Sequence, residues 1–326
     1  MKRILFVLTL FLSNLTFGQN NVHIASIGTF KTKSGGIIKN CKIGYRTSGK
    51  LNNDKSNVIL WLPWLTGKSN FLINFIPSLM DTTGLYIIAV DPLSNGESSS
   101  PSNTPDFPSI SIFDMVKADH DLLINNLKIT HVKAVIGFSM GGMETFEWMV
   151  SYPDFMDNVI PIGGTPKQSF YDILLCQTEA NIILQAKKEK QDIRIAMQRV
   201  TDINILHDFT PQYLATTKSP DSVNVFLAKE YKTEYNADNY FSQLQAMISQ
   251  DIYKSSGRTI ADIKNFIKCK VFVIVTTQDF FVNPLNTIEF AKANNYRLVE
   301  LDGDFGHVSP FFKTAEIKQA ITQFLK

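Results

Sequence analysis

A serine between two glycines, in the run Gly-Phe-Ser-Met-Gly at 137–141, constrains the fold of this chain more than any other feature. An apolar run, 132–136, leads directly into it, and a stretch of helical character, 140–150, leads directly out. The pattern alone is weak, because small residues recur by chance, and a glycine-rich packing turn is the alternative. In this context it predicts a sharp strand-to-helix turn that strains the backbone of Ser139 and places its hydroxyl, the nucleophile, at the N-terminus of a helix.

A serine hydroxyl attacks efficiently only when a base takes its proton and a carboxylate orients that base. The chain has five histidines. Four of them are poorly placed to act as this base. His23 lies in the N-terminal strand region and His120 within a predicted helix. His131 lies ahead of the serine's strand, and His207 lies in a polar helical stretch. His307 alone follows the last predicted strand, where the chain order serine, acid, histidine places the base. A surface loop histidine is the alternative.

The acid is sought near the end of the apolar run 271–276, which Asp279 follows closely. An aspartate beyond the end of a strand, one strand before the histidine loop, is placed to hold the imidazole. Asp302 and Asp304 compete for this role, but they lie too close to His307 in sequence for the usual geometry. The alternative for Asp279 is a cap on the next helix. The sequence therefore predicts the triad Ser139, Asp279 and His307.

Two backbone N–H groups are expected to stabilise the oxyanion that forms during attack. One belongs to Met140, at the N-terminus of the helix after the nucleophile, where the helix dipole favours negative charge. The other is expected from the loop 63–67, after the apolar run 58–62, with Leu65 as the candidate. Losing such a donor typically lowers turnover by a factor of about a hundred to a thousand. No metal or organic cofactor is expected, because triad chemistry needs none.

Short apolar runs alternate with helix-like stretches along most of the chain, as buried parallel strands with crossover helices do. The runs lie at 58–62, 85–90, 132–136, 158–162, 270–276 and 297–301. The sequence thus predicts an α/β-hydrolase fold over 20–326, with a mostly parallel central sheet flanked by helices. The loop 93–108, rich in Ser, Pro, Asn and Gly, is expected to be irregular and exposed.

The alternation stops between about 167 and 258, where the chain is helical and polar. An all-helical block between two α/β segments predicts a lid inserted into one domain, at about 167–258. Arg194, Arg199 and Arg258 in and beside this block could bind an anionic donor, although such arginines are more often plain surface charges.

The N-terminus is expected to be a secretory signal peptide, 1–19. Lys2 and Arg3 precede an almost unbroken apolar run at 4–12, and small polar residues follow. The run is too short to span a bilayer comfortably; a buried first strand or a membrane anchor is the alternative. We expect a periplasmic or secreted protein with no stable membrane anchor after cleavage.

Composition narrows the class of protein. With 326 residues, 44% hydrophobic and 19% charged, the chain can build a sizeable core. A formal net charge of +2 without a basic run gives no reason to expect nucleic acid. Cys41, Cys176 and Cys269 form no metal motif and are expected in the core, while oxidation of one pair stays open. The number of subunits is not fixed, and a homodimer is compatible with the sequence.

These residues together resemble the homoserine O-acetyltransferase family within the α/β-hydrolases. The likeness is most specific at 107–153, where 138–143 is similar to the family's nucleophile segment, and 65–67 is similar to its oxyanion loop. The resemblance covers most of 40–310 and implies the same triad. It also implies an Asp directly after the catalytic histidine, a further glycine-rich loop and cytoplasmic work with acetyl-CoA. This chain differs, with Val308 after the histidine, 91–97 in place of that loop and an export signal.

The sequence favours an esterase-like serine hydrolase that acts on an ester or a related small acyl compound. Ser139 would attack the acyl carbon, and water would clear the acyl-enzyme. The alternative is an O-acyltransferase of the homoserine O-acetyltransferase type, which differs only in the alcohol that attacks the acyl-enzyme. A catalytically silent binding protein is a third interpretation, and the complete set of triad residues argues against it.

Overall fold

The structure is a computed structural model that describes residues 21–232 and 235–326. The predicted signal peptide, 1–19, lies outside the described residues. None of the described helices combines the length and apolar character needed to cross a membrane.

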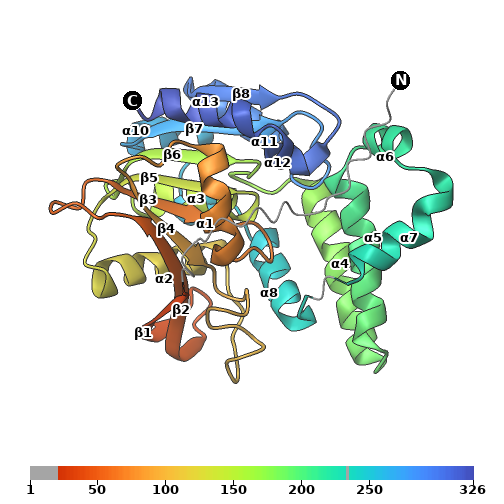
Figure 1. Ribbon diagram of the computed structural model, residues 1–326. Helices are drawn as coiled ribbons and strands as arrows, with labels where there is room; N and C mark the ends of the chain where they lie inside the picture. The colour runs from red at the N-terminus through yellow and green to blue at the C-terminus, as the bar shows by residue number, and fades with distance from the viewer. Residues whose placement is uncertain (1–20, 233–234) are drawn as a thin grey trace.

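An eight-stranded sheet in the order β1-β2-β4-β3-β5-β6-β7-β8 forms the centre of the molecule (Figure 1). β1 pairs antiparallel with β2 and β2 with β4, and every other neighbouring pair is parallel. The strands are β1 (His23–Lys31), β2 (Ile37–Gly49), β3 (Val58–Leu62), β4 (Tyr86–Asp91), β5 (Val132–Phe138), β6 (Met156–Ile162), β7 (Lys270–Thr276) and β8 (Arg297–Leu301). The predicted mostly parallel sheet is confirmed.

Helices cover both faces of the sheet, as the alternation along β3 shows. Ile59 and Trp61 pack into the apolar cluster under α1 and α13, whereas Leu60 and Leu62 pack into the cluster under α2, α3 and α11. Both faces are therefore buried, which is why the strands are continuous apolar runs. These helices are α1 (Ser69–Leu79), α2 (Ile112–Asp121) with the π-helical turn Leu122–Asn126, α3 (Met140–Ser151), α11 (Leu285–Asn294) and α13 (Thr314–Phe324).

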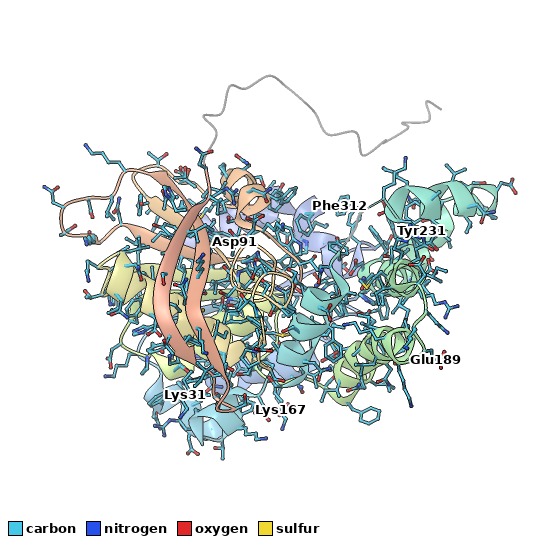
Figure 2. All side chains as sticks on the ribbon, turned by 90° about the horizontal axis from the view of Figure 1, so that it is seen from below. Lys31, Asp91, Lys167, Glu189, Tyr231 and Phe312 are labelled. Atoms are coloured by element: carbon cyan, nitrogen blue, oxygen red, sulfur yellow. The ribbon has the colours of Figure 1, made fainter. Side chains whose placement is uncertain are left out.

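The described chain between β6 and β7 consists of helices and loops, with one isolated bridge between Lys167 and Asp251. We call it the helical insertion; Figure 1 shows its first helices, α4 to α7, to one side of the sheet and α10 beside β7, and Figure 2 labels Glu189 and Tyr231 in it. It continues past the predicted end at 258, because a further helix precedes β7. Its helices are α4 (Phe170–Lys188), α5 (Ile193–Asp208), α6 (Pro211–Thr217), α7 (Val223–Glu230), α8 (Ala237–Ile248), α9 (Ile252–Ser256) and α10 (Ile260–Phe266), with a 3-10 turn at Pro220–Ser222.

The serine-rich loop after β4 is irregular, but the expectation that it is exposed is wrong for its first part, where Ser98, Ser99 and Ser100 are buried. Serine hydroxyls satisfy the neighbouring backbone. Ser98 Oγ accepts the N–H of Gly44 at 2.8 Å, and Ser99 Oγ accepts that of Lys42 at 3.0 Å. The loop therefore packs on β2, and its polar composition serves hydrogen bonding inside the protein rather than contact with water.

Two buried acids face each other where α2 packs on α3. Asp119 and Glu144 are 1% and 0% exposed, and their carboxyl oxygens have no hydrogen-bond partner in the described structure. Burial raises the pKa of Glu144, and the charge of Asp119 raises it further; burial and Asp91 do the same for Asp119. The folded protein therefore retains protons on this pair at a pH where the unfolded chain has lost them.

We expect Glu144→Gln to stabilise the protein increasingly as pH rises. A carboxyl with a raised folded-state pKa contributes stability that is complete below about pH 4 and is lost as the pH rises through that pKa. Relative to the native protein, the variant's free energy of unfolding should rise between about pH 5 and about pH 8. Urea titrations at the two pH values measure this. The exposed Glu316→Gln is the control, and an equal shift in both variants would contradict the prediction.

Candidate active site

The predicted nucleophile lies in a strained turn between β5 and α3. Ser139 has φ 57° and ψ −116° and is 1% exposed. A Cβ at Gly137 would lie 2.0 Å from the carbonyl oxygen of Gly141, and a Cβ at Gly141 would lie 2.3 Å from that of Leu62. Both flanking positions therefore require glycine, which is the physical content of the sequence pattern.

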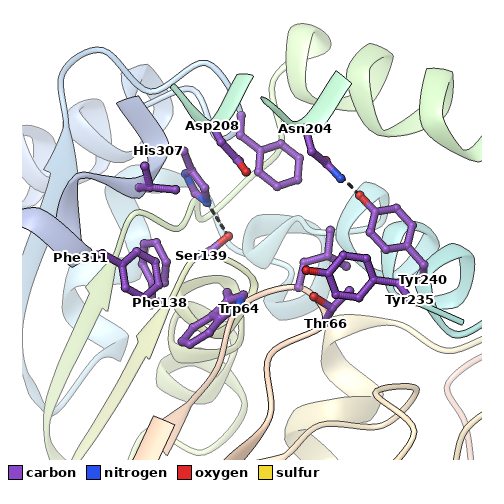
Figure 3. A pocket seen from close by; sticks show the side chains of 13 residues that line it. Trp64, Thr66, Phe138, Ser139, Asn204, Asp208, Tyr235, Tyr240, His307 and Phe311 are labelled. Carbon is purple, nitrogen blue, oxygen red and sulfur yellow. Dashed lines mark hydrogen bonds between the residues drawn. The ribbon is translucent and has the colours of Figure 1, made fainter. Parts of the chain in front are cut away.

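The structure brings Ser139, Asp279 and His307 into one chain of hydrogen bonds (Figure 3 shows its serine–histidine part). Ser139 Oγ donates to His307 Nε2 at 2.8 Å, and His307 Nδ1 donates to Asp279 Oδ2 at 2.7 Å. All three are buried, at 1%, 4% and 5% exposure. With its proton held on Nδ1 by the carboxylate, the imidazole presents Nε2 as an acceptor to the serine.

Asp279 also caps the turn that follows it. Its Oδ1 accepts the N–H groups of Phe281 and Val282 at 2.9 and 2.8 Å, while Oδ2 faces His307. The alternative, a cap on the next helix, is wrong, because Pro284 is the N-cap of α11 and Asp279 binds only the turn before it. The competitors Asp302 and Asp304 have no recorded bond to the His307 ring.

The loop that carries His307 is fixed by its neighbours. The ring stacks on Phe138 at 5.4 Å between centroids and meets Phe281 edge-on at 5.1 Å. Gly306 has φ 59°, and a Cβ there would lie 2.6 Å from the carbonyl oxygen of Asp208. The 3-10 turn Gly306–Val308, which leads into α12 (Ser309–Phe312), therefore packs against the C-terminal end of α5. The helical insertion directly contacts the histidine loop.

The two predicted oxyanion donors border the same site. Met140 opens α3, so its N–H has no partner within the helix. Gly67 N–H donates to the Trp64 carbonyl at 2.8 Å and closes a turn from which the Leu65 and Thr66 N–H groups point outward. Gln243 Oε1 accepts the Thr66 N–H at 2.9 Å. Leu65 therefore remains the candidate for the second donor, and its side chain lines the cavity beside Ser139.

A small cavity of about 160 Å³ opens at Ser139 (Figure 3). Its sheet-domain wall is aromatic: Phe311 meets Trp64 and Phe138 edge-on, each at 5.2 Å. The helical insertion contributes a polar wall made of Asn204, Asp208, Tyr235 and Tyr240. This volume is below that of pockets for drug-sized ligands, about 300–1,000 Å³, so the cavity suits a small acyl compound.

Sequence reasoning did not find the polar wall of the cavity. Asn204, Asp208 and Tyr235 carry no motif, and only the packing of the insertion on the histidine loop brings them to the site. The arginines considered from sequence lie elsewhere: Arg194 pairs with Asp192 at 2.7 Å, and the Arg258 guanidinium lies 3.8 Å from the Phe266 ring centroid. No Lys or Arg is among the described residues that line the cavity.

The described residues offer no group of three or more His, Cys, Asp or Glu side chains able to hold a metal ion. Cys41, Cys176 and Cys269 are buried and free, in agreement with their expected place in the core. Ser139 thus provides a nucleophile and His307 a base, and the cavity lining adds hydrogen-bond donors and an apolar wall.

Known proteins similar to this chain include esterases and acyltransferases. A protein of Corynebacterium glutamicum named a probable esterase is 38% identical over 288 residues, covering 81% of this chain and 82% of that protein. An ethyl acetate hydrolase of Pseudomonas veronii is 28% identical, covering 79% and 80%. A homoserine O-acetyltransferase of Trichormus variabilis is 25% identical, covering 90% and 91%. The resemblance to that family is confirmed.

Solved structures show the same fold. An acetylester hydrolase from Corynebacterium glutamicum superposes with a TM-score of 0.85 at 24% identity, covering 94% of this chain and 96% of that one. Residues 57–314 match the alpha/beta hydrolase fold family. This range contains the strand-to-helix turn at Ser139, the predicted acid Asp279 and the predicted base His307. This match spans most of the chain, and the probable esterase of Corynebacterium glutamicum is 38% identical to it. The chain therefore belongs to the alpha/beta hydrolase fold family.

Proposed function

We propose that the protein is a serine esterase that hydrolyses esters of short acyl groups through an acyl-enzyme. The observation that carries the proposal is the hydrogen-bonded chain from Asp279 through His307 to Ser139 at the mouth of a small, partly aromatic cavity. The names of the first two relatives, a probable esterase and an ethyl acetate hydrolase, favour this reaction.

The reaction follows from the positions of the atoms. Ser139 Oγ attacks the acyl carbon while its proton passes to His307 Nε2, and the N–H groups of Met140 and Leu65 stabilise the oxyanion. The imidazolium then gives its proton to the leaving alcohol oxygen as the ester C–O bond breaks. Water attacks the acyl-enzyme and transfers a proton to the same nitrogen. The acid leaves, and the proton returns to Ser139 Oγ.

Transfer to homoserine needs a site for an amino acid acceptor, and the described lining of the cavity offers only part of one, Asp208, which could face an amino group. Val308, a cavity residue, occupies the position where the transferase family is expected to carry an Asp for the substrate's amino group. An amino acid acceptor also brings a carboxylate, and the described lining provides no Lys or Arg to receive it. Fold membership alone does not decide between the two reactions.

The proposal is tested with p-nitrophenyl acetate in the presence and absence of about 10 mM L-homoserine. We expect p-nitrophenol and acetate to be released in equal amounts in water alone, and homoserine to leave both rates unchanged. Acetylated homoserine, followed by mass spectrometry, should stay below about a tenth of the product. Release that depends on homoserine, with O-acetylhomoserine as the main product, would establish the transferase instead.

Export is the second part of the proposal. The basic start and the short apolar run at 4–12 support a cleaved signal peptide and a periplasmic or secreted enzyme. N-terminal sequencing of the protein recovered outside the cytoplasm tests this, with a start near residue 20 expected. An intact Met1 on the cytoplasmic protein would reject it.

A further inference from the structure

A buried ion cluster supports the polar wall of the cavity. His207 lies between two carboxylates: its Nε2 is 3.0 Å from Glu179 Oε1, and its Nδ1 is 3.2 Å from Asp208 Oδ1. The Tyr240 hydroxyl donates to the other Glu179 oxygen at 2.8 Å, and Asn204 Oδ1 lies 3.1 Å from the same hydroxyl oxygen. The cluster thereby joins α4, α5 and α8 of the helical insertion.

His207 carries a positive charge in this cluster. Burial alone would lower its pKa, but the close carboxyl groups of Asp208 and Glu179 outweigh burial and raise the pKa to about 9. The ring stacks on Phe281 at 4.1 Å, and Phe281 in turn touches His307. One imidazolium thus lies between two carboxyl groups.

Asp208 brings one carboxyl group of this cluster to the cavity. The side chains of Glu179 and His207 are 0% and 4% exposed, whereas that of Asp208 is 31% exposed and lines the cavity. Figure 3 shows it descending from α5 beside His307, above Ser139. Since the described lining contains no Lys or Arg, a cation in the cavity would be attracted and an anion repelled.

We infer that Asp208 determines substrate specificity, and that it favours esters whose alcohol part carries a protonated amino group. The inference rests on the proposed esterase function. The alcohol is the relevant part because His307 Nε2 delivers its proton to the leaving oxygen, so the alcohol departs on the histidine side of Ser139. The end of α5 packs on the histidine loop on that side. The aromatic wall is left for the acyl group.

The test compares two acetate esters of nearly equal shape, cationic 2-(dimethylamino)ethyl acetate and neutral 3-methylbutyl acetate. The quantity measured is the ratio of their kcat/KM values at one pH, because changes that affect the triad alike for both esters cancel. We expect the native enzyme to prefer the cationic ester. Asp208→Asn should lower the ratio by about five- to tenfold, the size expected for a partly exposed charge pair.

Asp202→Asn is the matched control, because Asp202 also lies on α5 but accepts the Tyr231 hydroxyl, at 2.6 Å, and does not line the cavity. Its ratio should equal that of the native enzyme. In case Asp208→Asn does not fold, the native enzyme provides a second test: added salt should lower the ratio, since part of the carboxylate is exposed.

The possible results separate the two proposals. Hydrolysis of both esters without cationic preference, a ratio unchanged by Asp208→Asn, or a ratio independent of salt would overturn the role of Asp208 and leave the esterase function intact. Failure to hydrolyse either ester would reject the esterase function and, with it, this inference.

Discussion

Replacing Ser139 by Ala is expected to lower kcat for hydrolysis of p-nitrophenyl acetate by at least about 10⁴-fold. The variant loses the hydroxyl that is bonded to His307 Nε2, so water must attack the ester without an acyl-enzyme. The oxyanion donors and the cavity would remain, which is why activity above the uncatalysed rate should persist. Initial rates at saturating ester, corrected for spontaneous hydrolysis, measure the loss.

The same variant should fold as the native protein does. Alanine removes one oxygen atom from a residue whose backbone already tolerates φ 57°, and no neighbouring group needs to move. Thermal unfolding midpoints within about 3 °C of each other would show this; a shift of about 1 kcal/mol would move the midpoint by roughly 2–4 °C. With the native enzyme, mass spectrometry after rapid quenching should detect an acetyl group on the peptide containing Ser139. Retention of more than a hundredth of native activity by the variant would contradict the assignment of the nucleophile.

The parts of the fold that local patterns encode could be predicted from the sequence. Strands buried on both faces appear as continuous apolar runs, and β7 and β8 begin and end where the runs did. Parallel strands present their carboxyl ends at one edge, and Leu62 pairs with Gly137 while Phe138 pairs with Ile162. Residues just beyond these ends therefore meet, although they are far apart in the chain.

What could not be predicted depends on packing between distant segments. The serine-rich loop resembles an exposed one in composition, and only its hydrogen bonds to β2 show why it is buried. Asp208 is the last residue of a polar helix, and nothing local indicates that it faces Ser139. The specificity proposed for the enzyme thus depends on contacts between the helical insertion and the sheet domain, which no sequence pattern indicates. The triad residues, by contrast, lie in turns that a sequence pattern does indicate.

Asp279→Asn is expected to lower kcat by about 10⁴-fold while leaving all three catalytic side chains in place. The reason lies in the two oxygens of Asp279. Since Oδ1 accepts the N–H groups of Phe281 and Val282, the oxygen of an asparagine would keep that position, and its NH₂ would face His307 Nδ1. A donor there makes Nδ1 an acceptor and places the ring proton on Nε2. That nitrogen could then no longer accept the proton of Ser139.

Asp304→Asn makes the same chemical change three residues from the histidine and compares Asp279 with one of its two competitors. Asp304 accepts the Thr210 hydroxyl through its backbone carbonyl, so this variant keeps that bond and should retain kcat within about twofold. A large loss in Asp304→Asn with a small one in Asp279→Asn would move the acid to the histidine loop. Loss of activity only in Asp279→Asn would instead assign the acid to Asp279. Asp279, just beyond the end of β7, would then fix the tautomer of His307, and this tautomer would decide whether His307 can accept the proton of Ser139, at the end of β5.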